Sequence, residues 1–283
     1  MAQQIHWFPG HMNKALNEVE TKVKLVDVVI ELLDARAPLS SINENLEKLI
    51  QNKKKLIVLT KIDLADPEAT KEWINFFKQK YDSVLTLDLK KSGGENILSK
   101  AVINLGKDKW AKEKAKGMKP QPIRAMIIGI PNVGKSSLIN RIAKRKAAGV
   151  QNKPGFTRGE QWIKVNQDFL LLDTPGILPM SYENQKKAAN LALIGSIRED
   201  ILPNETLGEL LLAYLRNQYP SALFSRFGIE AIGDRLVVLN QISEKRKLVD
   251  GVGQNDLKRS EALLLKEFKD GLLGQITLEK YGT

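Results

Sequence analysis

The sequence predicts an α/β fold, with a mostly parallel sheet covered by helices on both faces and followed by a small, mostly helical domain. Two observations predict it. Buried-strand patterns alternate with amphipathic helical patterns through the first 181 residues, as expected for a parallel sheet. From about residue 182 onward, apolar residues recur at i, i+3 and i+4, as in Thr206–Tyr214 and Asp256–Phe268. We therefore predict two domains, residues 1–181 and residues 182–283.

Each element of the first domain has its own pattern. Strands are predicted for the apolar runs 27–34, 55–59, 83–87, 123–128, 161–165 and 169–172. Helices are predicted for residues 15–26, 43–51, 67–80 and 95–105, and from residue 137 onward. Residues 106–121 interrupt the alternation with six lysines and two acidic residues. We interpret this stretch as an exposed basic linker that is partly helical.

The net charge of +11 favours a polyanionic partner, which could be nucleic acid or an anionic membrane surface. Residues 1–184 hold most of it, with 30 Lys and Arg against 20 Asp and Glu. A merely solubilising surface is the alternative. A membrane-surface role needs a basic amphipathic helix with exposed aromatic residues, and only residues 107–119 distantly fit that description.

The sequence also excludes several classes of protein. It has no cysteine, which rules out disulfides and thiolate metal sites. No apolar run reaches the roughly 18 residues of a membrane span. The first residues lack the pattern of a secretory signal. We therefore expect a cytoplasmic protein.

A phosphate-binding pattern lies at the centre of the chain. Gly129–Ser136 fits G-x-x-x-x-G-K-[ST], between a predicted strand and a predicted helix. Glycines let backbone N–H groups close around phosphates, and the helix N-terminus favours an anion. Lys135 is expected to reach the outer phosphates and Ser136 to ligate Mg²⁺. The residues expected to hold the phosphates are Asn132, Val133, Gly134, Lys135, Ser136 and Ser137.

A second phosphate motif follows 38 residues after Lys135. Asp173-Thr174-Pro175-Gly176 comes directly after an apolar strand. Asp173 at such a strand end holds Mg²⁺, and the Gly176 N–H contacts the γ-phosphate. The same four letters also describe an ordinary turn, and the motif gains weight only from its distance to the first one.

A base-recognition motif is predicted at Thr60-Lys61-Ile62-Asp63, again at a strand end. The Asp63 carboxylate can accept two hydrogen bonds from guanine, whereas adenine offers no donors in that arrangement. The stem of Lys61 can lie along the base. Thr60 stands where the strong form of this motif has Asn, so we expect the loops to be tied less firmly and the base to bind more weakly. Residues Asp88, Leu89 and Lys90 follow the next strand, where a backbone N–H would meet the guanine carbonyl.

The order of these motifs is reversed relative to ordinary GTPases, as in circularly permuted GTPases. With the flanking sequences, the chain resembles the bacterial ribosome biogenesis GTPase A family over nearly its whole length. The flanks that carry the resemblance are Trp7–Met12, Asp34–Pro38, Gly129–Ser137, Pro154–Thr157 and Leu273–Glu279. Departures from the family pattern are Thr60, the poor match at Asp88-Leu89, and Ala37 in place of Ile.

The resemblance implies a function and partners. It implies a GTPase that binds GTP and GDP with Mg²⁺ and acts late in assembly of the large ribosomal subunit. It also implies a C-terminal helical domain, here residues 182–283, that binds ribosomal RNA. We expect a monomer with no DNA or membrane partner. The alternative is an RNA-binding scaffold in which nucleotide only stabilises or regulates the fold.

Catalysis poses a problem, because Ile177 occupies the position where many GTPases have a Gln that orients water. Intrinsic hydrolysis should therefore be slow. His11, in the unusual segment 5–14, is the best candidate to replace the missing Gln, and the resemblance supports this role. The alternative is that His11 packs within its segment or contacts RNA. Thr157 is the expected switch threonine that ligates Mg²⁺. Asn132 resembles the residue that helps hold K⁺ in relatives, or else stabilises its own loop.

Overall fold

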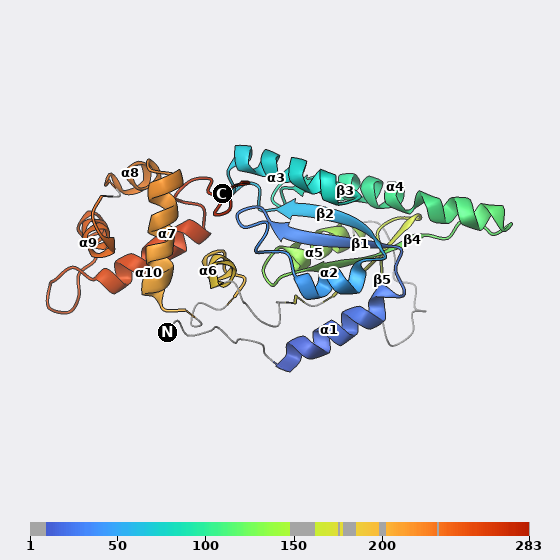
Figure 1. Ribbon diagram of the computed structural model, residues 1–283, viewed down its shortest axis with the longest axis horizontal. Helices are drawn as coiled ribbons and strands as arrows, with labels where there is room; N and C mark the ends of the chain where they lie inside the picture. Colours follow the sequence, from blue (N-terminus) through green and yellow to red (C-terminus); the bar gives the residue numbers. More distant parts are fainter. Residues whose placement is uncertain are drawn as a thin grey trace.

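The computed structural model describes residues 10–147, 162–174, 176–177, 185–197, 202–230 and 232–282 (Figure 1). The side chains of residues 10–13, 15 and 144–147 lie outside this description. We call residues 10–177 the N-terminal part and residues 185–282 the helical part. In Figure 1 the two parts lie side by side along the long axis, with α6 (Gln185–Leu193) between them.

One mixed sheet forms the centre of the N-terminal part. Among the described residues it has six strands in the order β3-β2-β1-β4-β6-β5. Neighbouring strands run parallel, except that β5 is antiparallel to β6. The strands are β1 (Val28–Asp34), β2 (Lys54–Thr60), β3 (Ser83–Leu87), β4 (Ile123–Gly129), β5 (Trp162–Lys164) and β6 (Phe169–Leu172). This topology confirms the predicted α/β fold, and each predicted strand lies within two residues of its observed bounds.

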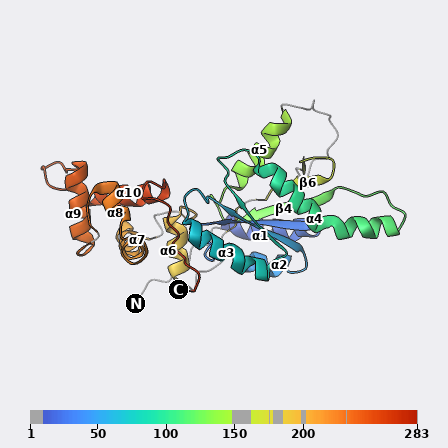
Figure 2. The same ribbon diagram turned by 90° about the horizontal axis from the view of Figure 1, so that it is seen from above.

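Helices cover both faces of the sheet (Figure 2). They are α1 (Gly10–Val23), α2 (Glu44–Ile50), α3 (Pro67–Lys80), α4 (Gly94–Ala115) and α5 (Lys135–Ala147). Successive strand residues point to opposite faces, so Ile30 packs with the apolar residues of α4 and α5. Val29 packs with those of α1 and α2, while Leu33 packs with those of α3.

The bounds of two helices differ from the sequence prediction. Helix α1 begins five residues earlier than expected and ends at Val23, because the chain must already pair with β4 through the bond from Asp27 N to Arg124 O. Helix α4 continues to Ala115, ten residues beyond the expected end, so the first part of the basic stretch is regular helix. Gly106 does not break α4; a Cβ there would lie 2.5 Å from Ile123 Cδ1, so glycine lets the helix approach β4.

The helical part contains α6, α7 (Asn204–Gln218), α8 (Ala222–Phe227), α9 (Arg235–Arg246) and α10 (Leu257–Lys269). The two predicted helical patterns fall on α7 and α10. Their apolar faces meet in one core, for example at Leu211 and Leu264. In the described residues no helix is long and apolar enough to cross a membrane.

The segment after α10 returns to the N-terminal part. Backbone bonds join Ile276 N to Leu64 O at 3.0 Å and Leu278 N to Arg36 O at 2.7 Å. The Glu279 carboxylate accepts from the backbone N–H groups of Leu39 and Ser40 at 2.7 and 3.1 Å. These contacts join the end of the helical part to the N-terminal part.

Candidate nucleotide site

The sheet topology places a ligand site at one edge. The connection from β1 leads outward to β2, whereas β4 connects toward β6 on the other side, so the strand order reverses between β1 and β4. In open α/β sheets, ligands bind outside the carboxyl ends of the strands at such a point. The predicted motifs at Gly129–Ser136, Thr60–Asp63 and Asp173 all follow the carboxyl ends of strands in this sheet.

The loop after β4, residues 129–136, has the backbone of a phosphate cradle. Gly129 has φ 148°, and a Cβ there would lie 2.7 Å from the Leu32 carbonyl oxygen. Gly134 has φ 110° and Asn132 has φ 58°, both in the left-handed region. Helix α5 begins directly afterwards at Lys135, so its N-terminal N–H groups face the cradle. We refer to residues 129–136 as the phosphate loop.

The Lys135 ammonium is held inside the phosphate loop. It donates to the carbonyl oxygens of Gly129 at 3.0 Å and Ile130 at 2.8 Å. Burial lowers the pKa of Lys135 to about 8, although the nearby Asp173 carboxylate opposes the shift. Gly176 lies against this ammonium, since a Cβ on Gly176 would be 3.0 Å from Lys135 Nζ. The two predicted phosphate motifs are therefore in contact.

A pH effect on binding follows from the buried ammonium. Phosphate oxygens stabilise the charged form and raise the lowered pKa of Lys135, so binding of GDP at about pH 8.5 should take up part of a proton. Affinity should accordingly fall as the pH rises above about 8. Titration calorimetry in two buffers of different ionisation enthalpy measures the uptake; equal apparent enthalpies in both buffers at pH 8.5 would contradict the prediction.

The segment after β6 is tied to the rest of the site. Ile177 N donates to the Gly129 carbonyl at 3.3 Å, and Lys22 of α1 donates to the Asp173 carbonyl at 3.1 Å. Partial desolvation raises the pKa of the Asp173 carboxyl, while Lys135 opposes that shift. The Ile177 side chain is buried with residues of α1 and α2. An apolar side chain packed in that cluster cannot orient a water molecule.

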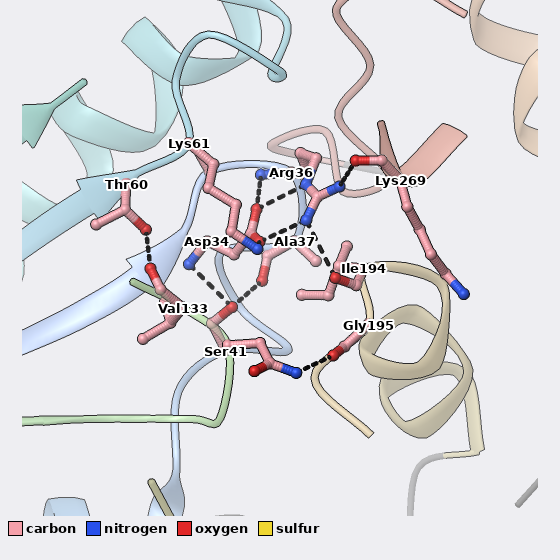
Figure 3. Close-up of polar contacts among 12 residues, drawn as sticks. Asp34, Arg36, Ala37, Ser41, Thr60, Lys61, Val133, Ile194, Gly195 and Lys269 are labelled. Carbon is pink, nitrogen blue, oxygen red and sulfur yellow. Dashed lines mark hydrogen bonds and ion pairs between the residues drawn. The ribbon is translucent and has the colours of Figure 1, made fainter. Parts of the chain in front are cut away.

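Thr60 ties the base-recognition loop to the phosphate loop (Figure 3). Its buried hydroxyl lies 2.7 Å from the carbonyl oxygen of Val133 and 3.1 Å from that of Leu33. Thr60 thus ties the two loops together, through its hydroxyl in place of the side-chain amide of the strong motif. A hydroxyl has only one hydrogen to donate. Because Thr60 lies at a strand end beside the phosphate loop, its short side chain is long enough to contact that loop.

The other base-recognition residues also converge. Asp63 forms an ion pair with Lys90 at 2.7 Å, which raises the pKa of Lys90. The N–H of Lys90 donates to Asp88 Oδ1 at 2.8 Å, which shapes the second base loop. Leu89 lies against Gly134, where a Cβ would be 2.6 Å from Leu89 Cδ1. An ammonium thus occupies the Asp63 carboxylate that was predicted to accept the guanine donors.

A buried ion pair that sequence analysis missed lies beside this site. Asp34 is fully buried, and the Arg36 guanidinium contacts both its oxygens, at 3.0 and 2.8 Å. Lys61 Nζ lies 3.1 Å from Asp34 Oδ2 (Figure 3). Burial favours the neutral acid, but Arg36 and Lys61 outweigh it and hold the pKa of Asp34 below its usual range. The available signal was a pair of charged residues, Asp34 and Arg36, at the end of a mostly apolar strand.

Two donors of the site reach the end of α6. Arg36 Nη2 donates to the Ile194 carbonyl at 3.1 Å, and Asn132 Nδ2 of the phosphate loop donates to the Gly195 carbonyl at 2.7 Å. The side chain of His11, in the first turn of α1, and the whole of Thr157 lie outside the described residues. Ser136 and Ser137 are exposed at the start of α5.

Comparison with known proteins identifies the family. A family described as 50S ribosome-binding GTPase matches residues 124–212. Ribosome biogenesis GTPase A of Bacillus cereus is 42% identical over 97% of this chain and 93% of its own length. Mouse mitochondrial ribosome-associated GTPase 1 is 32% identical over 97% of this chain and 90% of its own. The chain belongs to the ribosome biogenesis GTPase A family.

Solved structures agree with this assignment. YlqF from T. maritima in a GNP-bound structure is 26% identical, covers 94% of this chain and 98% of its own, and has a TM-score of 0.66. A GDP-bound YlqF structure has a TM-score of 0.67 and is 25% identical. This match covers 94% of this chain and all of the YlqF chain. As a member of the ribosome biogenesis GTPase A family, the protein has the circularly permuted GTPase fold and binds guanine nucleotide.

A metal ion fits the donors that this site offers. Among the described residues no cluster of three His, Asp or Glu side chains could hold a metal alone. Mg²⁺ in nucleotide sites takes most of its ligands from phosphates and water, with one or two protein oxygens. The exposed Ser136 hydroxyl and Asp173 carboxylate are oxygens of that kind.

Guanine selection can be tested at Asp63. Asp63→Asn should weaken GTP binding and improve binding of xanthosine triphosphate, because the amide offers a donor to the additional ring carbonyl. Competition binding with the two nucleotides measures the change, and Asp82→Asn, which lies just before β3 and outside the base-recognition motifs, is the matched control. Retained GTP preference in Asp63→Asn would remove residues 60–63 from the base site.

Proposed function

We propose that this protein hydrolyses GTP to time a late step in assembly of the large ribosomal subunit, slowly alone and faster on the subunit. The phosphate loop with its buried Lys135, in contact with Gly176 and facing the base-recognition residues, is the observation that carries the proposal. The large subunit comes from the description of the matching family, which names a 50S ribosome-binding GTPase.

Each predicted residue has a proposed role. Lys135 and the phosphate-loop amides of Asn132–Ser137 bind phosphate and neutralise charge in the transition state. Mg²⁺, which would polarise the phosphoryl oxygens, would be held by Ser136, Asp173 and Thr157. Gly176 would read the γ-phosphate. The base would be read by Thr60, Lys61, Ile62, Asp63, Asp88, Leu89 and Lys90.

Asn132 has a proposed second role toward K⁺. In the structure its side-chain amide donates to Gly195 of the helical part. Because the oxygen of an amide is its acceptor, and metals bind oxygen, that oxygen remains the group with which Asn132 would contact a K⁺ ion. The contact to Gly195 equally supports the loop-stabilising role.

His11 is the proposed group that assists the attacking water. Ile177 is buried and apolar, so the usual water-positioning place is not available. His11 lies at the start of α1, and the other end of that helix contacts the Asp173 carbonyl through Lys22. About 16 Å of helix separates His11 from Lys22, and we propose that the subunit brings the His11 side chain to the γ-phosphate.

Ribosomal RNA is the proposed partner, bound by the helical part and by the basic surface. The charge of +11 favours a polyphosphate, and such contacts release counterions. Binding to the subunit should therefore weaken steeply as salt rises. We further propose a monomer in the cytoplasm that binds neither DNA nor membrane.

Single-turnover GTP hydrolysis with and without purified large subunits tests the proposal. The subunit should stimulate the rate roughly tenfold or more, within the range of a supplied catalytic group. His11→Ala should keep GTP and subunit affinity but lose most of the stimulated rate.

Two results would contradict parts of this proposal. Equal stimulation of wild type and His11→Ala would remove His11 from catalysis. Binding to the subunit without stimulation of the wild type would favour the RNA-binding scaffold over the ribosome-activated GTPase.

A further inference from the structure

Arg141 joins two loops of the nucleotide site that are far apart in sequence. It lies on α5, the helix that starts at the end of the phosphate loop. Its guanidinium donates to the carbonyl oxygens of Leu89 and Lys91 and, through Nε, to Glu95 Oε1 at 2.7 Å. Leu89 and Lys91 belong to the loop between β3 and α4 that was predicted to meet the guanine carbonyl.

The geometry of these contacts restrains the loop on both sides of Lys90. A guanidinium is a planar fork with fixed donor directions, so two bonds to carbonyls two residues apart fix the orientation of the backbone between them. The loop's own bonds are short-range, from the N–H groups of Lys90 and Lys91 to Asp88. It continues into Gly93 at φ 98° and Gly94, and glycines leave a backbone free to move.

The same contacts fix the distance from this loop to the phosphate loop. Leu89 packs against Gly134, so closely that any side chain there would meet it. The Arg141 fork holds the other side of the loop against α5. A nucleotide has a fixed reach from base to phosphates, and a site that holds both loops in place before binding avoids the cost of ordering them.

We propose that Arg141 is a positioning residue for guanine recognition: it holds the loop of residues 88–91 so that its backbone N–H meets the guanine carbonyl. The carbonyl oxygen of Leu89 is engaged by Arg141 and the N–H of Lys90 by Asp88. Asp88 also accepts from the N–H of Lys91, and we assign the N–H of Leu89, beside the carbonyl that Arg141 holds, to the guanine carbonyl. The inference rests on the proposed assignment of Asp88, Leu89 and Lys90 to the base.

Arg141→Lys and Arg141→Met test this role, because Lys keeps the charge without the fork and Met keeps neither. The probes are GDP, the diphosphate of 2-aminopurine riboside, which lacks the guanine carbonyl and the adjacent ring N–H, and inorganic tripolyphosphate, which lacks the base. Both variants should bind GDP about tenfold more weakly. Binding of the 2-aminopurine nucleotide and of tripolyphosphate should change little, so the preference for GDP over the 2-aminopurine nucleotide should shrink.

Kinetics and controls complete the test. KM for GTP should rise while kcat at saturation stays near the wild-type value, because the lost interaction exists in the ground state and the transition state alike. Glu95→Gln, which removes the negative charge from one anchor of Arg141 but keeps an acceptor there, should show a smaller loss in the same direction. Lys100→Met, which removes an exposed charge from α4, should behave as wild type.

The outcomes are distinct. If folded Arg141→Lys keeps the wild-type preference for GDP over the 2-aminopurine nucleotide, the positioning role is wrong. Equal weakening of GDP, the 2-aminopurine nucleotide and tripolyphosphate would also overturn it, in favour of a general structural role. If wild type shows no such preference, the base assignment itself fails. Should Arg141→Met not fold, Arg141→Lys and Glu95→Gln decide.

Discussion

Replacing Lys135 with methionine is expected to abolish measurable GTP hydrolysis and to weaken GTP binding by roughly two orders of magnitude or more. The ammonium is the buried cation of the phosphate loop, and it rests on two loop carbonyls that a phosphate would replace. Methionine keeps most of the stem but removes the charge. Nucleotide binding by fluorescence titration and hydrolysis by phosphate release measure the two effects.

The stability of the nucleotide-free variant provides the control. Burial lowers the pKa of Lys135, so its charge destabilises the folded state at neutral pH. Lys135→Met should therefore unfold at the same temperature as wild type or higher. Normal turnover in the variant would move the phosphate site away from residues 129–136, whereas a large drop in melting temperature would show that the lysine is needed for the fold.

Replacing Arg36 with methionine is expected to destabilise the protein by about 3–5 kcal/mol, because it leaves Asp34 as a buried charge without its main partner. The variant also removes the donor to the Ile194 carbonyl at the end of α6. Urea denaturation monitored by tryptophan fluorescence measures the loss. Lys71→Met breaks the exposed pair of Lys71 with Glu68 and should change stability by no more than about 0.5 kcal/mol.

The pH dependence gives this prediction a second readout. In wild type the pKa of Asp34 is lowered on folding, so its stabilisation is present above the unfolded pKa of about 4 and is lost as the pH falls below it. In Arg36→Met the buried acid can become neutral at low pH. The difference in free energy of unfolding between variant and wild type should therefore become smaller as the pH falls toward 4. A difference that stays constant with pH would mean that Arg36 acts through packing alone.

The sequence predicts the centre of the sheet well because the strands there are buried on both faces. Val28–Asp34 and Ile123–Gly129 are mostly apolar runs, as is typical of the central strands of a parallel sheet. The end of α4 was predicted wrongly because Gly106 normally weakens a helix, whereas here it serves close packing against Ile123. That reason depends on a residue of another element, which the local pattern does not contain.

The candidate site shows the same limit. The motifs around Lys135 and Asp63 are local in sequence, so the order of the residues is enough to locate them. Thr60 and Arg141 tie the loops through backbone carbonyls, those of Val133 and Leu89 among them, and any residue type supplies a carbonyl. A pattern of residue types therefore cannot predict these contacts. They follow only from the order of strands that places the loops side by side.

The return of residues 276–279 to the N-terminal part has a mechanical consequence. The helical part is joined to the N-terminal part by the chain that leaves Ile177, by the end of α6, which accepts from Arg36 and Asn132, and by the segment whose Leu278 and Glu279 contact Arg36 and Leu39. A lobe held at several separate places cannot rotate as a rigid body about a single hinge. A protease cut between residues 178 and 184 would accordingly leave two fragments that remain associated and elute together.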